Sequence, residues 1–82
     1  MKYIESDKLE FQGVEITVMY YKDCDLYYAK ISHVIQEPDG NLYEPGGGTS
    51  MDSDLEHLKY KMTKSYLSNF HEGCTMVYNE KF

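Results

Sequence analysis

The spacing of apolar residues changes once along this chain, and that change limits the folds open to it. Apolar and polar side chains alternate from Val14 to Tyr21 and again from Leu26 to Gln36, as in strands with one buried face. From Met51 to Phe70 the apolar residues instead recur every three or four positions, which is the period of an amphipathic helix. Two different periods in one short chain predict an α+β fold.

Turn signals between these segments predict the order of the elements. Strands are expected at 14–21, 26–36, 42–43 and 74–79, with a weaker one at 8–11, and a helix is expected at 52–70. Asp39-Gly40 favours a tight hairpin, and three consecutive glycines at 46–48 favour a loop. The predicted fold is an antiparallel sheet of four to five strands in the order β-β-β-α-β, with one main helix packed on one face.

Both ends of the predicted helix carry capping residues. Ser53 and Glu56 have the spacing of a capping box, and Thr49 and Ser50 are alternative N-terminal caps. Gly73 is the expected C-terminal cap. The stripe expected to face the sheet consists of Met51, Leu55, Leu58, Met62 and Tyr66, joined by Leu67 and Phe70.

Length and cysteine content predict one small domain, residues 1–82, in a reducing compartment. A chain of 82 residues buries only about 60% of its unfolded surface, so its core is thin. Cys24 and Cys74 are the only cysteines, and the first seven residues lack the apolar run of a secretory signal. Free thiols in the cytoplasm are therefore expected, and no membrane segment is expected either.

The middle third of the chain is purely acidic. No positive residue occurs between Lys30 and Lys59, the chain contains no arginine, and the net charge is −6. Such a protein repels nucleic acid and anionic membranes, so the expected partner is a basic protein. The carboxylates expected to contact that partner are Glu37, Asp39, Glu44, Asp52, Asp54 and Glu56.

Residues suited to catalysis or metal binding are present but scattered. The three histidines occur singly, without the paired spacing of a zinc site, and the segment from Asp52 to Glu56 lacks the pattern of an EF-hand. No lysine follows the glycines at 46–48, as it would in a phosphate-binding loop. Cys74 and His71 are the nearest approach to a nucleophile and base. We expect no enzymatic activity, no cofactor and no metal.

Two tyrosine pairs flank the first predicted turn. Because side chains alternate along a strand, Tyr20-Tyr21 and Tyr27-Tyr28 each place one ring toward the helix and one on the opposite face. Large amphipathic rings on an uncovered face suit a protein interface, with Tyr21 and Tyr28 as contact residues. Cross-strand pairing of aromatic rings alone would also account for them, and pairing of edge strands could form a homodimer.

Part of the chain resembles the small domain of HicB-type antitoxins. The resemblance lies in Asp25-Leu26-Tyr27-Tyr28-Ala29 in a hairpin, in residues 48–55 opening a helix, and in a final strand. It extends over residues 14–79 at the level of element order. It implies a degenerate RNase H-like sheet that binds a toxin through protein contacts without catalysis, and the separate DNA-binding domain usual in that family does not follow before Phe82.

The overall character of the chain is similar to that of small phage-encoded inhibitors. Anti-CRISPR proteins and DNA mimics share its small size, acidity and lack of a catalytic constellation, and several of them use carboxylates in place of phosphates. Our expectation is therefore a non-enzymatic, protein-binding inhibitor, phage-encoded and acting in the host cytoplasm. It would block a basic, nucleic-acid-binding or defence protein. A HicB-like module that neutralises a small toxin is the alternative.

Overall fold

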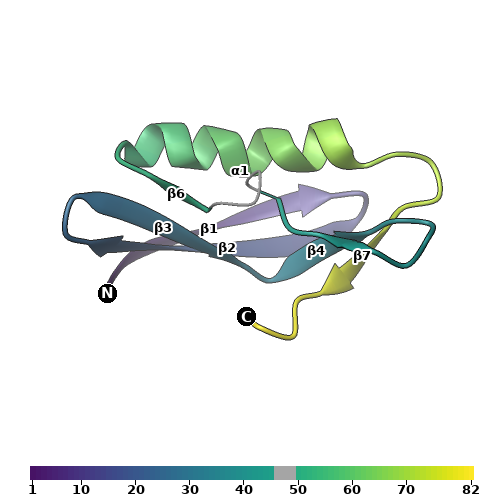
Figure 1. Cartoon of the computed structure of the whole chain (residues 1–82), viewed down its shortest axis with the longest axis horizontal. Helices are drawn as coiled ribbons and strands as arrows, with labels where there is room; N and C mark the ends of the chain where they lie inside the picture. Colours follow the sequence, from purple (N-terminus) through teal and green to yellow (C-terminus); the bar gives the residue numbers. More distant parts are fainter. Residues whose placement is uncertain (46–49) are drawn as a thin grey trace.

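The chain forms two antiparallel sheets that share one covering helix (Figure 1). The computed structural model describes residues 1–45 and 50–82. The larger sheet has the strand order β1-β2-β3-β6 and the smaller one β5-β4-β7, so the predicted α+β class is confirmed. The elements are β1 (Lys2–Phe11), β2 (Val14–Asp23), β3 (Leu26–Ile31), β4 (His33–Gln36), β5 (Leu42–Tyr43), β6 (Met51–Asp52), α1 (Leu55–Asn69) and β7 (Thr75–Tyr78).

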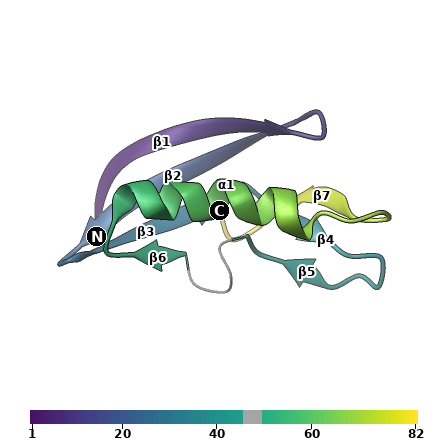
Figure 2. The same ribbon diagram turned by 90° about the horizontal axis from the view of Figure 1, so that it is seen from above.

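Helix α1 runs along the length of both sheets and covers one face of each (Figures 1 and 2). Its side chains Leu58, Met62 and Tyr66 are at most 1% exposed. Burial of this apolar surface is the main stabilising contribution in a chain of this size. The other core residues come from the sheets and from the segment before β7: Ile16, Val18, Tyr20, Ala29, Ile31, Val34, Ile35 and Cys74.

The first hairpin is longer than the sequence predicted. β1 begins at Lys2 rather than near Lys8, and it pairs with β2 through a two-residue turn. Gln12 and Gly13 both have positive φ, 53° and 78°, as a type I′ turn requires. Charged residues obscure the alternation in the first half of β1, and a register shift between Tyr3 and Glu5 interrupts it further.

The predicted strand at 26–36 is interrupted at Ser32, which divides one expected sheet into two. The Ser32 hydroxyl accepts a hydrogen bond from the Thr17 N–H (2.8 Å), and the Ser32 carbonyl accepts one from the Asn79 N–H (2.7 Å). The strand therefore leaves β2 at this residue and continues as β4 beside β7. Ile31 before the break and Ile35 after it both belong to the buried core.

The helix starts three residues later than predicted. Asp54, not Ser53 or Ser50, is the N-cap, and its side chain accepts from the N–H groups of Glu56 (3.0 Å) and His57 (3.4 Å). Residues 51–52 are unavailable to the helix because they pair with β3 as β6. The alternative cap Thr49 and the predicted glycine loop at 46–48 lie outside the described residues.

The C-terminal end and the apolar stripe also differ from the prediction. The C-cap is Phe70 in an extended conformation, while Gly73, with φ of 88°, lies in the turn before β7. A Cβ on Gly73 would come within 2.9 Å of a Pro38 side-chain carbon, so this position favours glycine twice over. Met51 lies in β6 and Leu67 is 65% exposed, so neither belongs to the buried stripe.

Candidate functional site

The face of the larger sheet turned away from α1 carries the most distinctive side chains. Tyr21 on β2 lies directly opposite Tyr28 on β3, and Met51 on β6 lies opposite Tyr28. On the other side, Tyr3 on β1 lies opposite Tyr21. We call the set Tyr3, Met19, Tyr21, Tyr28 and Met51 the tyrosine face.

Contacts within the tyrosine face hold the rings while leaving part of each in solvent. The rings of Tyr3 and Tyr21 meet edge to face with centroids 5.7 Å apart, and the Lys30 ammonium lies 5.1 Å from the Tyr21 ring centroid. Tyr3 remains 48% exposed and Met51 39% exposed. One ring of each tyrosine pair thus lies on the uncovered face, as predicted; the direct pairing of Tyr21 with Tyr28 and the presence of Tyr3 and Met51 beside them were not predicted.

The six predicted carboxylates do not form one surface. Glu37 and Asp39 lie at the β4–β5 turn, at the end of the molecule where α1 finishes (Figures 1 and 2). Asp52, Asp54 and Glu56 lie at the opposite end, where α1 begins. The molecule is 39 Å long, so its two acidic groups cannot contact a compact target feature together. Sequence spacing could not reveal this, because the separation arises from strand pairing: β6, just before α1, pairs with the start of β3, whereas the β4–β5 turn follows the end of β4.

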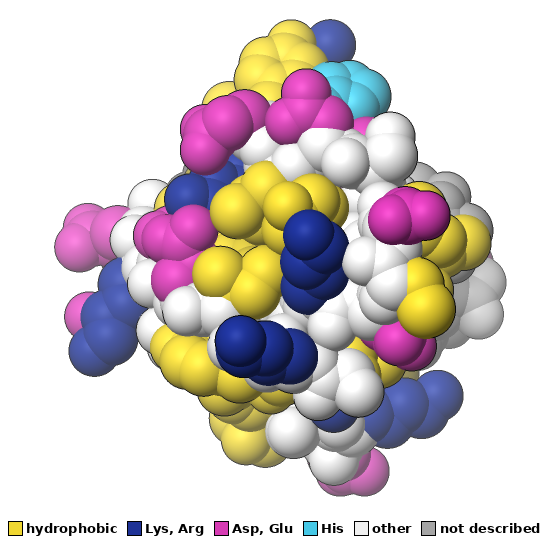
Figure 3. Space-filling model, turned by 90° about the vertical axis from the view of Figure 1, so that its left-hand side faces the viewer, with side chains coloured by type: hydrophobic (Ala, Val, Ile, Leu, Met, Phe, Trp, Pro, Cys, Tyr) yellow, Lys and Arg dark blue, Asp and Glu magenta, His cyan; other side chains and the backbone are white. Residues whose placement is uncertain are grey.

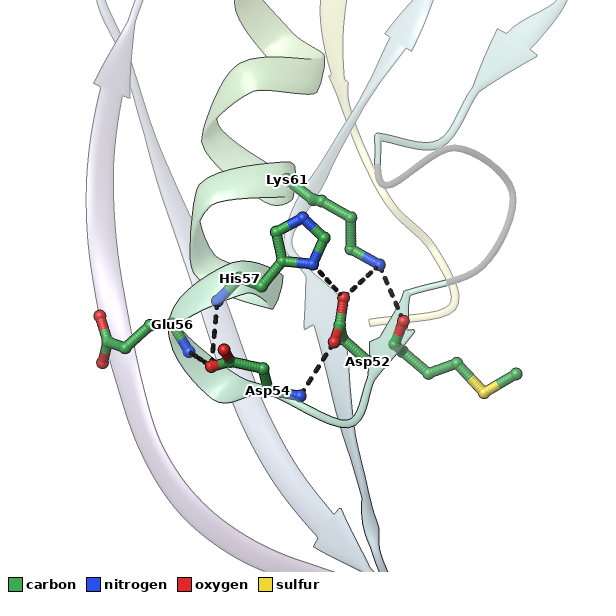
Figure 4. A network of polar contacts seen from close by, with 6 residues as sticks. Asp52, Asp54, Glu56, His57 and Lys61 are labelled. Atoms are coloured by element: carbon green, nitrogen blue, oxygen red, sulfur yellow. Dashed lines mark hydrogen bonds and ion pairs between the residues drawn. The ribbon is translucent and has the colours of Figure 1, made fainter.

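Asp52 is the centre of a polar network at the helix start (Figure 4). One carboxylate oxygen accepts from the Asp54 N–H (2.9 Å), and the other lies 2.5 Å from His57 Nδ1 and 3.0 Å from Lys61 Nζ. Lys61 also donates to the Met51 carbonyl (2.9 Å). The Asp54 hydrogen bond, followed by the Lys61 contact, lowers the pKa of Asp52 to about 2. The network fastens β6 to α1.

Glu56 takes part in a second cluster, which fastens β1 to α1. Lys59 Nζ lies 3.0 Å from Glu5 and 3.9 Å from both Asp7 and Glu56. The hydrogen bond with Glu5, supported by the nearby carboxylates, raises the pKa of Lys59. The three predicted contact residues at this end therefore all have partners within the chain: lysines lie beside Asp52 and Glu56, and Asp54 caps the helix.

The other three predicted carboxylates, Glu37, Asp39 and Glu44, have fewer partners among the described residues. Asp39 closes its own turn by accepting from the N–H and the side-chain amide of Asn41 (2.9 and 2.8 Å). Glu37 and Glu44 are exposed, and no ion pair involves either within the described part of the chain. Glu44 acts through space on the core, because its charge adds to the effect of burial in raising the pKa of Tyr66.

Charges of both signs surround the end of the molecule where α1 begins. Figure 3 looks onto this end and shows apolar side chains near the centre, with lysines lying across them and carboxylates around them. A phosphate-like array of carboxylates would need an unbroken negative surface. This end does not present one.

Two hollows open on the outer faces of the sheets, the faces turned away from α1. One, of about 330 Å³, is lined by Tyr28, Lys30, Met51 and their neighbours; the other, of about 500 Å³, has Val34 and Val77 of the smaller sheet in its lining. Glu44 contributes to both. Sequence reasoning predicted neither hollow, because their lining residues come from segments that are distant in the sequence.

Catalytic and metal-binding groups are not gathered anywhere in the described ranges. Over residues 1–45 and 50–82, no three His, Cys, Asp or Glu side chains converge as metal ligands. Cys74 is buried, and a backbone hydrogen bond connects its N–H to the carbonyl of exposed His71 (3.0 Å). Cys24 and Cys74 are both free thiols, the first exposed.

Comparison with known proteins adds no relative. No protein-family model matches the chain, and no match was found among curated proteins or solved structures. In addition, no helix in the described ranges is long and apolar enough to cross a membrane.

Proposed function

We propose that this protein is a non-enzymatic binding protein that contacts a partner protein through the tyrosine face. The observation that carries the proposal is the position of Tyr21 opposite Tyr28 on a sheet face that α1 does not cover. Tyrosine supplies a large apolar area together with a hydroxyl group, and it loses little conformational freedom on binding. Such residues are enriched among the strongest contributors to protein interfaces.

Binding through this face would inhibit a partner by covering its surface, without any reaction. This mode is the one that the resemblance to HicB-type antitoxins implies, with a small toxin as the partner. Two free thiols suit the reducing cytoplasm, where we place the protein. The net charge of −6 favours a basic partner and speeds its approach.

The long edge strand β1 argues against a second copy of the chain as the partner. In a two-fold antiparallel pairing of two β1 strands, registers that pair most of the strand are centred on Glu5, Ser6, Asp7 or Lys8. When the pairing is centred on Ser6, Glu5 of each copy lies opposite Asp7 of the other copy. When it is centred on one of the three charged residues, that residue lies opposite the same residue of the other copy. Like charges directly opposite destabilise a sheet. A different protein is the better candidate.

Affinity purification from a bacterial lysate tests the proposal. The Tyr21→Ser/Tyr28→Ser double variant should lose at least about tenfold of the protein captured by the wild type, as expected for interface anchors. Tyr60→Ser is the matched control, because Tyr60 lies on α1 and is 58% exposed. Mass spectrometry would then identify the captured protein as a toxin, a nuclease or a nucleoid protein. Undiminished capture by the folded double variant would refute the proposal.

Inhibition of a basic target by the acidic residues is a second candidate, favoured by the exposed carboxylates of Glu37 and Glu44. Replacing all six predicted carboxylates by Asn or Gln should then abolish capture at low salt, and raising the salt should weaken capture by the wild type. Under the tyrosine-face proposal, salt matters little and the tyrosine variants have the larger effect. The two experiments together decide between a phage-type DNA-mimic inhibitor and a HicB-like mode.

A further inference from the structure

The two outer hollows lie along one line of side chains. Tyr28 and Lys30 belong to the smaller hollow, and Val34 and Gln36 belong to the larger one. On β3 the first two alternate with buried Ile31, on β4 the last two alternate with buried Ile35, and Glu44 lines both hollows. The two hollows are therefore parts of one outer groove.

The distance between the two hollows suits an extended peptide segment. Lys30 and Val34 are four residues apart on either side of the break at Ser32, which corresponds to at most about 13 Å. An extended chain places side chains of the same side at similar intervals, so one segment can reach both hollows. The two hollows, of about 500 and 330 Å³, are open to solvent and large enough to receive one side chain each.

The lining of the groove is apolar at its floor and exposed at its rim. Val34 is 6% exposed and Val77 is half-buried, whereas Leu42 and Tyr78 are 63% and 61% exposed. The wall beside Tyr78 is held in place by Asn79, whose side-chain amide donates to the Ile31 carbonyl (3.0 Å). Exposed apolar side chains around a fixed hollow indicate a place for an apolar side chain of a partner.

One charged residue, Glu44, lies where the two hollows meet. Glu44 lines both of them, whereas Lys30 belongs to the smaller hollow and Glu80 and Lys81 to the larger one. The Lys30 ammonium lies over the ring of Tyr21, directed toward the tyrosine face. Glu44 forms no ion pair within the described residues, so a cation between the two apolar sites would complete its interactions.

We propose that an extended segment of the partner protein lies in this outer groove, with a lysine or arginine side chain at Glu44 and one apolar side chain in each hollow. The proposal rests on the proposed function and names the partner's chemistry. It extends the contact surface from the tyrosine face onto the smaller sheet. Residues that sequence reasoning did not select, Leu42 and Val77, then become contact residues.

A random twelve-residue peptide display library, selected on the immobilised full chain, tests this inference. Enriched peptides should contain a lysine or arginine with an apolar residue on each side within about four positions. Synthetic copies should bind Glu44→Lys at least about tenfold more weakly than the wild type, and Leu42→Ser more weakly as well. Glu72→Lys is the matched charge control, because Glu72 is exposed and lies outside the groove. Amide NMR shifts should fall on β3, β4 and Glu44.

Three results would overturn the groove: no enriched peptide, enriched peptides without a basic residue, or equal binding to Glu44→Lys and the wild type. The captured lysate protein separates this failure from failure of the proposed function. If capture is lost in the Tyr21→Ser/Tyr28→Ser variant but unchanged in Glu44→Lys, the tyrosine-face proposal is supported and the groove proposal is refuted. If the tyrosine variant retains full capture, the proposed function itself falls.

Discussion

The two faces of the larger sheet are built from alternating residues of the same strands, but only one of them is completed within the chain. Tyr20 and Tyr21 are neighbours on β2; Tyr20 is 2% exposed beneath α1, whereas Tyr21 is half-buried on the tyrosine face. Burial, together with the charges of Asp7, Glu5 and Glu56, raises the pKa of Tyr20. Aromatic residues on the covered face thus serve stability, and we propose that those on the outer face contact a partner. Substitutions on the first should reduce stability, and those on the second should reduce binding.

The largest expected loss of stability comes from a substitution on the covered face. Leu58→Ala removes a side chain that is fully buried between α1 and the sheets, and the cavity should lower the free energy of unfolding by about 3 kcal/mol. Leu67→Ala, at a 65% exposed position of the same helix, should change it by less than about 0.5 kcal/mol. Urea unfolding followed by circular dichroism measures both. Equal losses of unfolding free energy in the two variants would show that α1 does not pack on the sheets through Leu58.

A smaller loss of stability is expected when the polar contact between α1 and the smaller sheet is removed. The Tyr66 hydroxyl donates to the His33 carbonyl at 2.6 Å, and Tyr66→Phe leaves this partly buried carbonyl without that partner. The free energy of unfolding should fall by about 1.5 kcal/mol. Tyr60→Phe removes an exposed hydroxyl on the same helix and should have almost no effect in the same urea titration. A silent Tyr66→Phe would contradict the assigned hydrogen bond.

On the outer face the expected effect on stability is smaller still. Single substitutions Tyr21→Ser and Tyr28→Ser, combined in a double-mutant cycle, should give a coupling energy of about 0.5 kcal/mol, as for other cross-strand pairs. The same substitutions should remove most of the partner binding. A coupling energy above about 2 kcal/mol would instead show that the pair serves mainly to stabilise the sheet.

The network at Asp52 should make the link between β6 and α1 sensitive to acid. The pKa of Asp52 is about 2 in the fold and 3.8 without its partners, so its stabilising effect is complete above about pH 4. The effect is lost as the pH falls toward 2. The difference in unfolding free energy between wild type and Asp52→Asn should therefore shrink from pH 5 to pH 2. In a Lys61→Met background the difference should be smaller, and a difference independent of pH would exclude this role.

Local sequence signals were sufficient for the elements but not for their boundaries. The alternation along 14–21 and 26–36 placed Tyr21 and Tyr28 on the same outer face, and the structure confirms this. The break at Ser32 had no such signal, because it depends on hydrogen bonds with Thr17 and Asn79, which are distant in the sequence. The start of α1 at Leu55 was missed for a similar reason, since β6 forms only by pairing with β3.

The sequence by itself determined the α+β class, the covered stripe of Leu58, Met62 and Tyr66, and the outward tyrosines, because these follow from the periods of strand and helix. Only the tertiary structure decided where the carboxylates between Lys30 and Lys59 lie. It separated Glu37 and Asp39 from Asp52 and Asp54 by the length of the molecule, and it engaged Asp39, Asp52 and Asp54 in local hydrogen bonds. The physical reason is that charge adjacency along a chain carries no information about which strands will pair.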